Sequence, residues 1–81
     1  MQTTYKEKTI SPTVKFREII IFEHLTGHAF AGDTAEEMLQ LYYAAVIKAL
    51  GYQPPVDEFL DWVEEKPEDF ATFVKENFNT D

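Results

Sequence analysis

Residues 34–51, TAEEMLQLYYAAVIKALG, constrain the fold of this chain more than any other stretch. The stretch opens with Thr34-x-x-Glu37, the capping-box pattern in which the two side chains accept hydrogen bonds from backbone N–H groups at a helix start. It closes on Gly51, and glycine adopts the left-handed conformation past a helix end at little cost. These signals predict a helix over residues 34–50.

This predicted helix is apolar around most of its circumference. Leu41, Tyr43 and Ile47 lie off its main apolar stripe, which has helical spacing and consists of Met38, Leu39, Tyr42, Ala45, Val46, Ala49 and Leu50. A helix of this kind is central, with neighbours on more than one side. We expect the stripe to be core, and we expect surface for a partner first on the flank with Tyr43 and Ile47.

Length and charge limit the possible functions. At 81 residues the chain is expected to form a single domain, residues 1–81, near the small end of what folds alone. Residues 33–81 carry three lysines against twelve acidic residues, a net charge of −9. An acidic surface repels phosphates and anionic membranes, so we expect neither nucleic acid nor a membrane as a direct partner.

The absence of cysteine excludes disulfides, thiolate metal sites and a cysteine nucleophile. The first eight residues, MQTTYKEK, lack the apolar core of a signal peptide, and no apolar run approaches the roughly 20 residues of a membrane span. We therefore expect a cytoplasmic chain.

The N-terminal third is predicted to contain an arm and one helix. Residues 1–10 have too few apolar anchors to predict a strand, so we expect an extended or mobile arm. Ser11 as N-cap and Pro12 in the first turn predict a helix over residues 12–26. The β-branched run at 19–22 also suits a buried strand, but length and the capping signals favour the helix.

Two further helices are predicted in the C-terminal half. A Pro54-Pro55 turn separates the central helix from a helix over residues 56–65, and Pro67 begins another over residues 67–78. Phe30, in the connector before the central helix, is expected to fold onto the core, and residues 79–81 are expected to fray. The sequence thus predicts an all-α bundle of four helices, with the N-terminal arm outside it.

No residue pattern predicts catalysis or a bound metal. His24 and His28 are four apart, but Gly27 between them ends the helix that would align them. The acidic series from Asp57 to Asp69 is interrupted by large apolar residues and has no glycine, unlike a calcium loop, so we interpret it as a solvated helix face. We expect no enzyme activity, no metal and no cofactor.

Aromatic residues point instead to protein binding. Tyr43 lies off the main stripe of its helix, and Trp62 falls between the apolar and acidic faces of the helix at 56–65. Both residue types are frequent anchors at protein interfaces, although most aromatic residues at helical spacing are core. Our candidate partner-binding residues are Tyr43, Ile47 and Trp62.

The order of these elements resembles the small tail assembly chaperones of long-tailed bacteriophages and prophages. The resemblance rests on three short segments: FREIIIFEHLTGHAF at 16–30, LYYAA at 41–45 and DEFLDWV at 57–63. It implies a non-enzymatic helical protein of the bacterial cytoplasm that binds the tape measure protein and tail tube protein while the tail is built, with possible self-association. The family has no catalytic residues to transfer.

Two alternatives stay open. The charge of −9 over residues 33–81 also suits an acidic inhibitor or nucleic-acid mimic that binds a basic partner. A mimic should set its carboxylates at phosphate-like spacing, whereas helix amphipathicity alone explains the acidic residues here. A small regulatory domain with an unknown partner is the other alternative.

Overall fold

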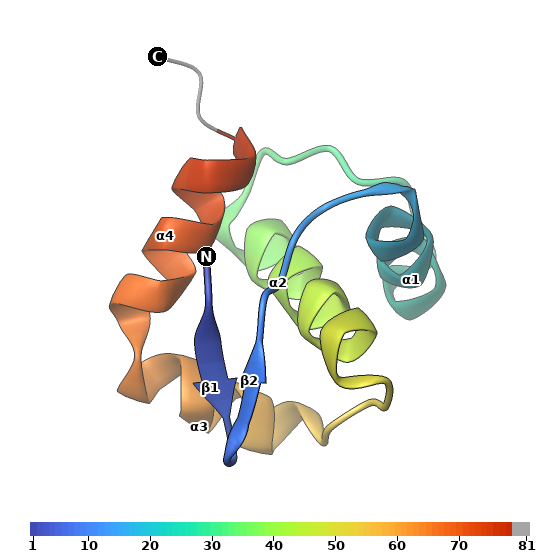
Figure 1. Ribbon diagram of the computed structural model, residues 1–81. Helices are drawn as coiled ribbons and strands as arrows, with labels where there is room; N and C mark the ends of the chain where they lie inside the picture. The colour runs from blue at the N-terminus through green and yellow to red at the C-terminus, as the bar shows by residue number, and fades with distance from the viewer. Residues whose placement is uncertain (79–81) are drawn as a thin grey trace.

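The central helix of the computed structural model is α2, Ala35–Leu50, and the other elements surround it (Figure 1). The structure describes residues 1–78, so the predicted fraying of residues 79–81 lies outside the described part. Thr34 caps α2, its side-chain oxygen accepting a hydrogen bond from the N–H of Glu37 at 3.1 Å. Gly51 ends α2 with φ of 84°, the left-handed conformation that favours glycine. The prediction for this helix is confirmed.

The capping box, however, is only half formed. The Glu37 carboxylate does not return to the N-cap residue but accepts hydrogen bonds from the N–H groups of Ala31 and Gly32 in the preceding connector. These hydrogen bonds lower the pKa of Glu37, with the Gly32 N–H as the largest cause. The side chain therefore fixes the loop that enters α2 as well as the first turn of the helix.

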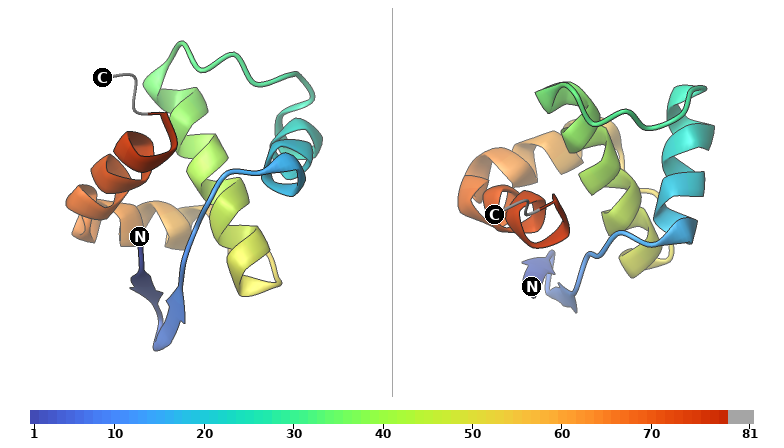
Figure 2. Two further views of the ribbon diagram at one scale, coloured as in Figure 1. Left: turned by 45° about the horizontal axis from the view of Figure 1, so that its top comes forward. Right: turned by 90° about the horizontal axis from the view of Figure 1, so that it is seen from above.

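The other helices are α1, Phe16–Thr26, α3, Val56–Glu65, and α4, Pro67–Phe78. Two views show α1 on one side of α2, with α3, α4 and the N-terminal strands on the other (Figure 2). A mostly helical fold is thus confirmed, and α3 and α4 have the predicted bounds. No helix within residues 1–78 is both long and apolar enough to cross a membrane.

The N-terminal arm is a β-hairpin: its backbone is extended, as predicted, but it is packed on the helices and does not lie outside the bundle. Strand β1, Thr3–Tyr5, pairs antiparallel with β2, Lys8–Ile10, and Thr4 lies opposite Thr9. Tyr5 and Ile10 are buried in the core formed by α2, α3 and α4. Tertiary contact therefore supplies the burial that three-residue strands lack alone.

Helix α1 begins four residues later than predicted. Pro12 is buried and not in a helical turn, and the Val14 N–H donates to the Asn77 side-chain oxygen of α4 at 3.1 Å. These contacts hold residues 11–15 as a segment that crosses from the hairpin to α1 (Figure 1). Lys15 is the N-cap residue instead of Ser11, and its N–H donates to the Glu18 carboxylate at 2.9 Å.

Two groups of buried side chains form the core. The smaller one joins α1 to α2 through Phe22, Leu41 and Ala44. Phe30 packs edge-on against Phe22 with ring centroids 5.3 Å apart, so its predicted return to the core is confirmed. The larger group lies between α2, α3, α4 and the hairpin, around the fully buried Tyr42.

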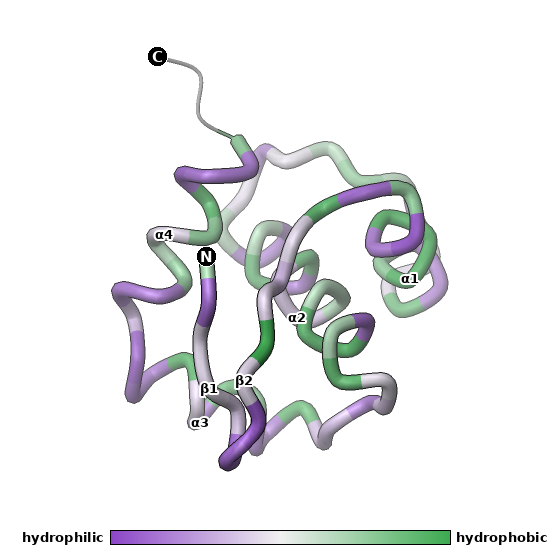
Figure 3. The backbone as a smooth tube through the Cα atoms, in the orientation of Figure 1, coloured by the Kyte–Doolittle hydropathy of each residue, from purple (hydrophilic) through white to green (hydrophobic). Residues whose placement is uncertain are grey.

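Hydropathy differs between the helices, as Figure 3 shows. Along α1 and the C-terminal half of α2 the backbone is coloured mainly as hydrophobic, whereas α4 alternates between the two extremes. Yet α1 packs mainly on α2, and Phe16 at its start remains 86% exposed. The domain therefore keeps apolar surface on and beside α1.

Candidate functional site

Two of the three predicted partner-binding residues are buried. Tyr43 is 6% exposed and Trp62 is 9% exposed, so neither ring offers much free surface, although Tyr43 lines the groove described below. Ile47 is half-buried against the larger core group. The three residues do not form a common exposed patch.

The N-terminal hairpin accounts for the burial of Trp62. The Trp62 ring lies between Tyr5 and Tyr42, with centroid distances of 5.0 and 5.7 Å. Its indole N–H donates to the Thr4 carbonyl oxygen at 2.9 Å, and the Lys66 amino group donates to the same oxygen at 3.0 Å. A strand that the sequence does not predict therefore covers this side of α3.

Tyr43 is buried by the turn that follows α2. Its hydroxyl donates to the carbonyl oxygen of Pro54, and its ring lies 4.7 Å from the Phe59 ring between centroids. The hydrogen bond ties the 52–55 turn to α2 and so sets where α3 begins. Tyr43 is consequently a wall residue between α2 and α3.

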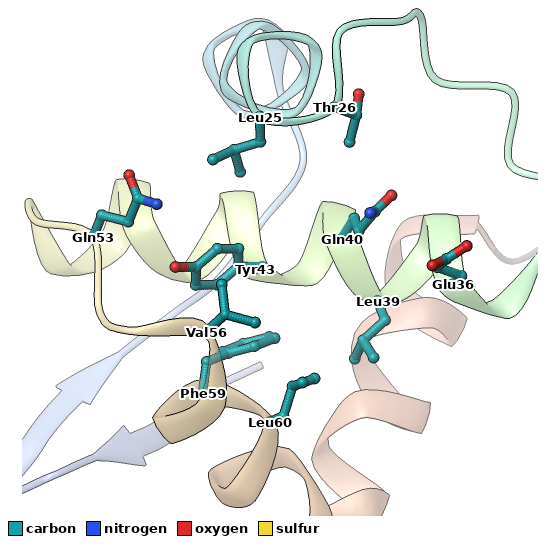
Figure 4. Close-up of a pocket in the computed structure, with 10 residues that line it drawn as sticks. All are labelled: Leu25, Thr26, Glu36, Leu39, Gln40, Tyr43, Gln53, Val56, Phe59 and Leu60. Carbon is teal, nitrogen blue, oxygen red and sulfur yellow. The ribbon is translucent and has the colours of Figure 1, made fainter.

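An open groove of about 460 Å³ lies across this part of α2 (Figure 4). Figure 4 shows its three sides, with Leu25 and Thr26 on α1, a row of side chains on α2, and a cluster on α3. The lining consists of Leu25, Thr26, Glu36, Leu39, Gln40, Tyr43, Gln53, Val56, Phe59 and Leu60. Its volume is within the range of about 300–1,000 Å³ that is usual for ligand pockets.

Helical spacing brings these residues together. On α2, Glu36, Gln40 and Tyr43 are separated by four and three residues, so they share one face of the helix. On α3, Val56 and Leu60 are four apart, so they also lie on one face. The groove is thus the space between these side chains of α2 and α3, with α1 on a further side.

Several apolar side chains of the groove remain accessible to solvent. Val56 is 50% exposed and Leu25 is 37% exposed, on different walls. Leu39 and Leu60, which also line the groove, are half-buried. An apolar hollow with exposed aliphatic walls is typical of a surface that contacts another molecule.

The groove lies beside acidic side chains. Glu36 belongs to its α2 wall, and the adjoining helix α3 carries exposed carboxylates outside the lining: Asp57, Asp61 and Glu64. We call these four residues the acidic border. A separate hollow at the start of α1 has three cationic side chains in its lining: Lys15, Arg17 and Lys48. A partner in the groove therefore meets mainly apolar side chains, one carboxylate of the lining and an acidic neighbouring helix.

Some acidic residues serve the fold instead of facing solvent. Glu58 accepts hydrogen bonds from the Lys6 amino group at 2.6 Å and from the Tyr5 hydroxyl at 2.8 Å. These two groups lower the pKa of Glu58, with Lys6 as the larger cause. Asp69 accepts a hydrogen bond from the Thr3 hydroxyl. The prediction of a uniformly solvated acidic face is therefore wrong for Glu58 and Asp69, which hold the hairpin.

The two histidines lie apart from the groove lining. His24 is exposed, and His28 follows the helix end at Gly27, with its Nδ1 3.6 Å from a Glu37 carboxylate oxygen. Within residues 1–78, no group of three or more histidine and acidic side chains is arranged to hold a metal ion.

Sequence reasoning found Tyr43 but missed the groove around it. The spacing of Val56, Phe59 and Leu60 gives an apolar stripe on the helix at 56–65. The signal that could have revealed the groove is the width of these stripes, since short helices in a small domain cannot bury them on every side.

No protein-family model, curated protein or solved structure matches this chain. The candidate site therefore rests on its own geometry.

Proposed function

We propose that this chain is a non-enzymatic tail assembly chaperone of a bacteriophage or prophage. In this function it binds the tape measure protein and the tail tube protein in the cytoplasm of the bacterial host while the tail is built. The observation that supports the proposal is the open apolar groove with an acidic border between α1, α2 and α3. Such a groove suits reversible contact with a protein segment.

The groove has the properties that a chaperone needs. Exposed aliphatic walls at Leu25 and Val56 offer apolar contact without a rearrangement of the core. The surrounding carboxylates and the net charge of −8 keep the free protein in solution despite that apolar surface. The lining residues Tyr43 and Phe59 are fixed by packing against each other, so the groove is preformed and less ordering entropy is lost when a partner binds.

The structure gives less support to an acidic inhibitor or nucleic-acid mimic. Three carboxylates that would contribute to a phosphate-like row are engaged in contacts within the chain: Glu58 and Asp69 bind the hairpin, and Glu76 binds the N-terminal amino group at 2.7 Å. The preformed groove, in contrast, has mainly apolar walls. Apolar contact therefore accounts for more of the surface than mimicry of a charged polymer does.

Co-expression tests this proposal. The tagged chain is expressed with the tape measure and tail tube proteins encoded beside it, and we expect it to capture the tape measure protein. Val56→Asp should reduce this capture at least about tenfold, since it puts a charge into the groove, while an acidic residue in the first turn of α3 suits the helix dipole. Ile20→Asp is the matched control, because Ile20 has a similar exposure but does not line the groove.

Two results would contradict the proposal. One is a genome in which no tail genes neighbour this gene, since tail chaperones act on the products of adjacent tail genes. The other is efficient capture of the tape measure protein by the Val56→Asp variant, which would show that the groove is not the contact surface.

A further inference from the structure

We infer that the groove binds an amphipathic helix of two to three turns, with aliphatic residues on one face and lysine or arginine beside them. The inference rests on the proposed function for one point only, which is the identity of the protein that carries this helix. Three observations support it: the length of the groove, the position of its apolar walls and the sign of its border.

The length of the groove fits two turns of a helix. On α2 the lining runs from Glu36 to Tyr43, seven residues apart. At about 1.5 Å rise per residue this row is about 10 Å long, which matches two helical turns of an occupant. The hairpin strands do not line the groove, so it offers no sheet edge to which an extended segment could pair.

The walls suit aliphatic anchors. Leu25 on α1 and Val56 on α3 are the exposed apolar residues of the lining, and Leu39 and Leu60 add half-buried aliphatic surface. Anchors at i, i+3 or i+4, and i+7 of a helix lie on one face and can enter such a groove together. The polar Gln40 and Gln53 leave hydrogen-bonding groups at the edge for the occupant's polar face.

The acidic border favours an occupant with positive charge. Glu36 lines the groove, and Asp57, Asp61 and Glu64 are exposed along the adjoining helix α3. Lysine or arginine beside the anchors complements these carboxylates, whereas acidic residues are repelled. A symmetric pair of copies joined through this groove would place one acidic border against the other, so a second copy is a poorer occupant.

Peptide binding to the full chain tests the inference. Two labelled 18-residue peptides carry the same leucines at i, i+4, i+7 and i+11, flanked in one by lysine and in the other by glutamate. We expect fluorescence anisotropy to show at least about tenfold tighter binding of the lysine peptide, and this difference should shrink as salt is added.

Matched variants locate the binding surface. Leu25→Ser should weaken binding of the lysine peptide by about tenfold, and Ile20→Ser, equally apolar but outside the groove, should leave it unchanged. Glu36→Gln should weaken it about threefold, while Glu23→Gln on the exposed part of α1 should not. Circular dichroism checks that each variant is folded. If a groove variant does not fold, Val56→Asp is used in its place to test the groove.

Each other outcome counts against the inference. Equal binding of the two peptides, or equal binding by the groove variants and their controls, overturns it. A dimer in light scattering that Leu25→Ser dissociates would make a second copy the occupant and would overturn it as well. If the lysine peptide binds in the groove but no tape measure protein is captured, the proposed function fails and this inference stands. If the tape measure protein is captured but the lysine peptide does not bind in the groove, this inference fails and the proposed function stands.

Discussion

Replacing Tyr42 by phenylalanine should stabilise this protein. Tyr42 is fully buried, and its ring lies within 4.6–5.8 Å of four other aromatic rings, those of Phe59, Trp62, Phe70 and Phe73. Its hydroxyl is the one buried side-chain polar group within residues 1–78 that has no hydrogen-bond partner. Burial, and to a lesser extent the nearby Asp69, raises the pKa of Tyr42, so the group is a neutral and unpaired hydroxyl.

The expected gain follows from the cost of such a group. A buried polar group without a partner costs about 1–3 kcal/mol of stability. Tyr42→Phe removes the hydroxyl and keeps the ring contacts, so we expect the free energy of unfolding to rise by about 1 kcal/mol. For a chain of this length that gain raises Tm by about 4–8 °C.

The neighbouring tyrosine provides the control. The Tyr43 hydroxyl donates to the Pro54 carbonyl oxygen, so Tyr43→Phe removes a buried hydrogen bond and should lower stability by about 1 kcal/mol. Urea unfolding followed by circular dichroism measures both variants, since Trp62 fluorescence would itself change when Tyr42 is replaced. A destabilised Tyr42→Phe protein would refute the reasoning, because it would show that the hydroxyl has a partner.

Three further predictions concern other parts of the fold. Glu7 has φ of 58° in the hairpin turn, so Glu7→Gly should raise the free energy of unfolding by about 0.5–1 kcal/mol in urea titrations. The pKa of Glu37 is lower in the folded protein than in the unfolded chain. The ionised side chain therefore stabilises the fold at pH above the ordinary carboxyl pKa, and this contribution is lost as the pH falls through the pKa of the folded state. Glu37→Gln should flatten this part of the stability–pH curve, measured as Tm in buffers of decreasing pH. Phe22→Ala should lower the free energy of unfolding by about 3–5 kcal/mol, whereas Phe16→Ala on the exposed face of the same helix should change it by less than about 0.5 kcal/mol.

The sequence predicted most helix boundaries because local interactions decide them. Thr34 caps α2 through an N–H three residues away, and Gly51 takes the left-handed conformation that ends it. Prolines at 54, 55 and 67 interrupt the helical pattern through their own rings. These effects act within a few residues and do not depend on the rest of the fold.

The N-terminal hairpin could not be predicted in the same way. Its turn places Lys6 and Glu7 at positive φ, where asparagine and glycine are the usual signals. Its strands are stabilised by distant groups, including Glu58 on α3 and Asp69 on α4. The hairpin in turn buries Trp62, whose place between the apolar and acidic faces of its helix left its exposure undecided in the sequence.

What the sequence alone determined is the central helix and the two helices at 56–65 and 67–78. Tertiary structure decided the surroundings of Tyr43. Packing of the 52–55 turn against Tyr43 buries the ring, and the same packing sets α3 beside α2 so that Leu25, Val56 and Leu60 enclose a groove. Helical periodicity gives the face of each helix, but only the positions of the three helices relative to one another determine which apolar faces stay uncovered.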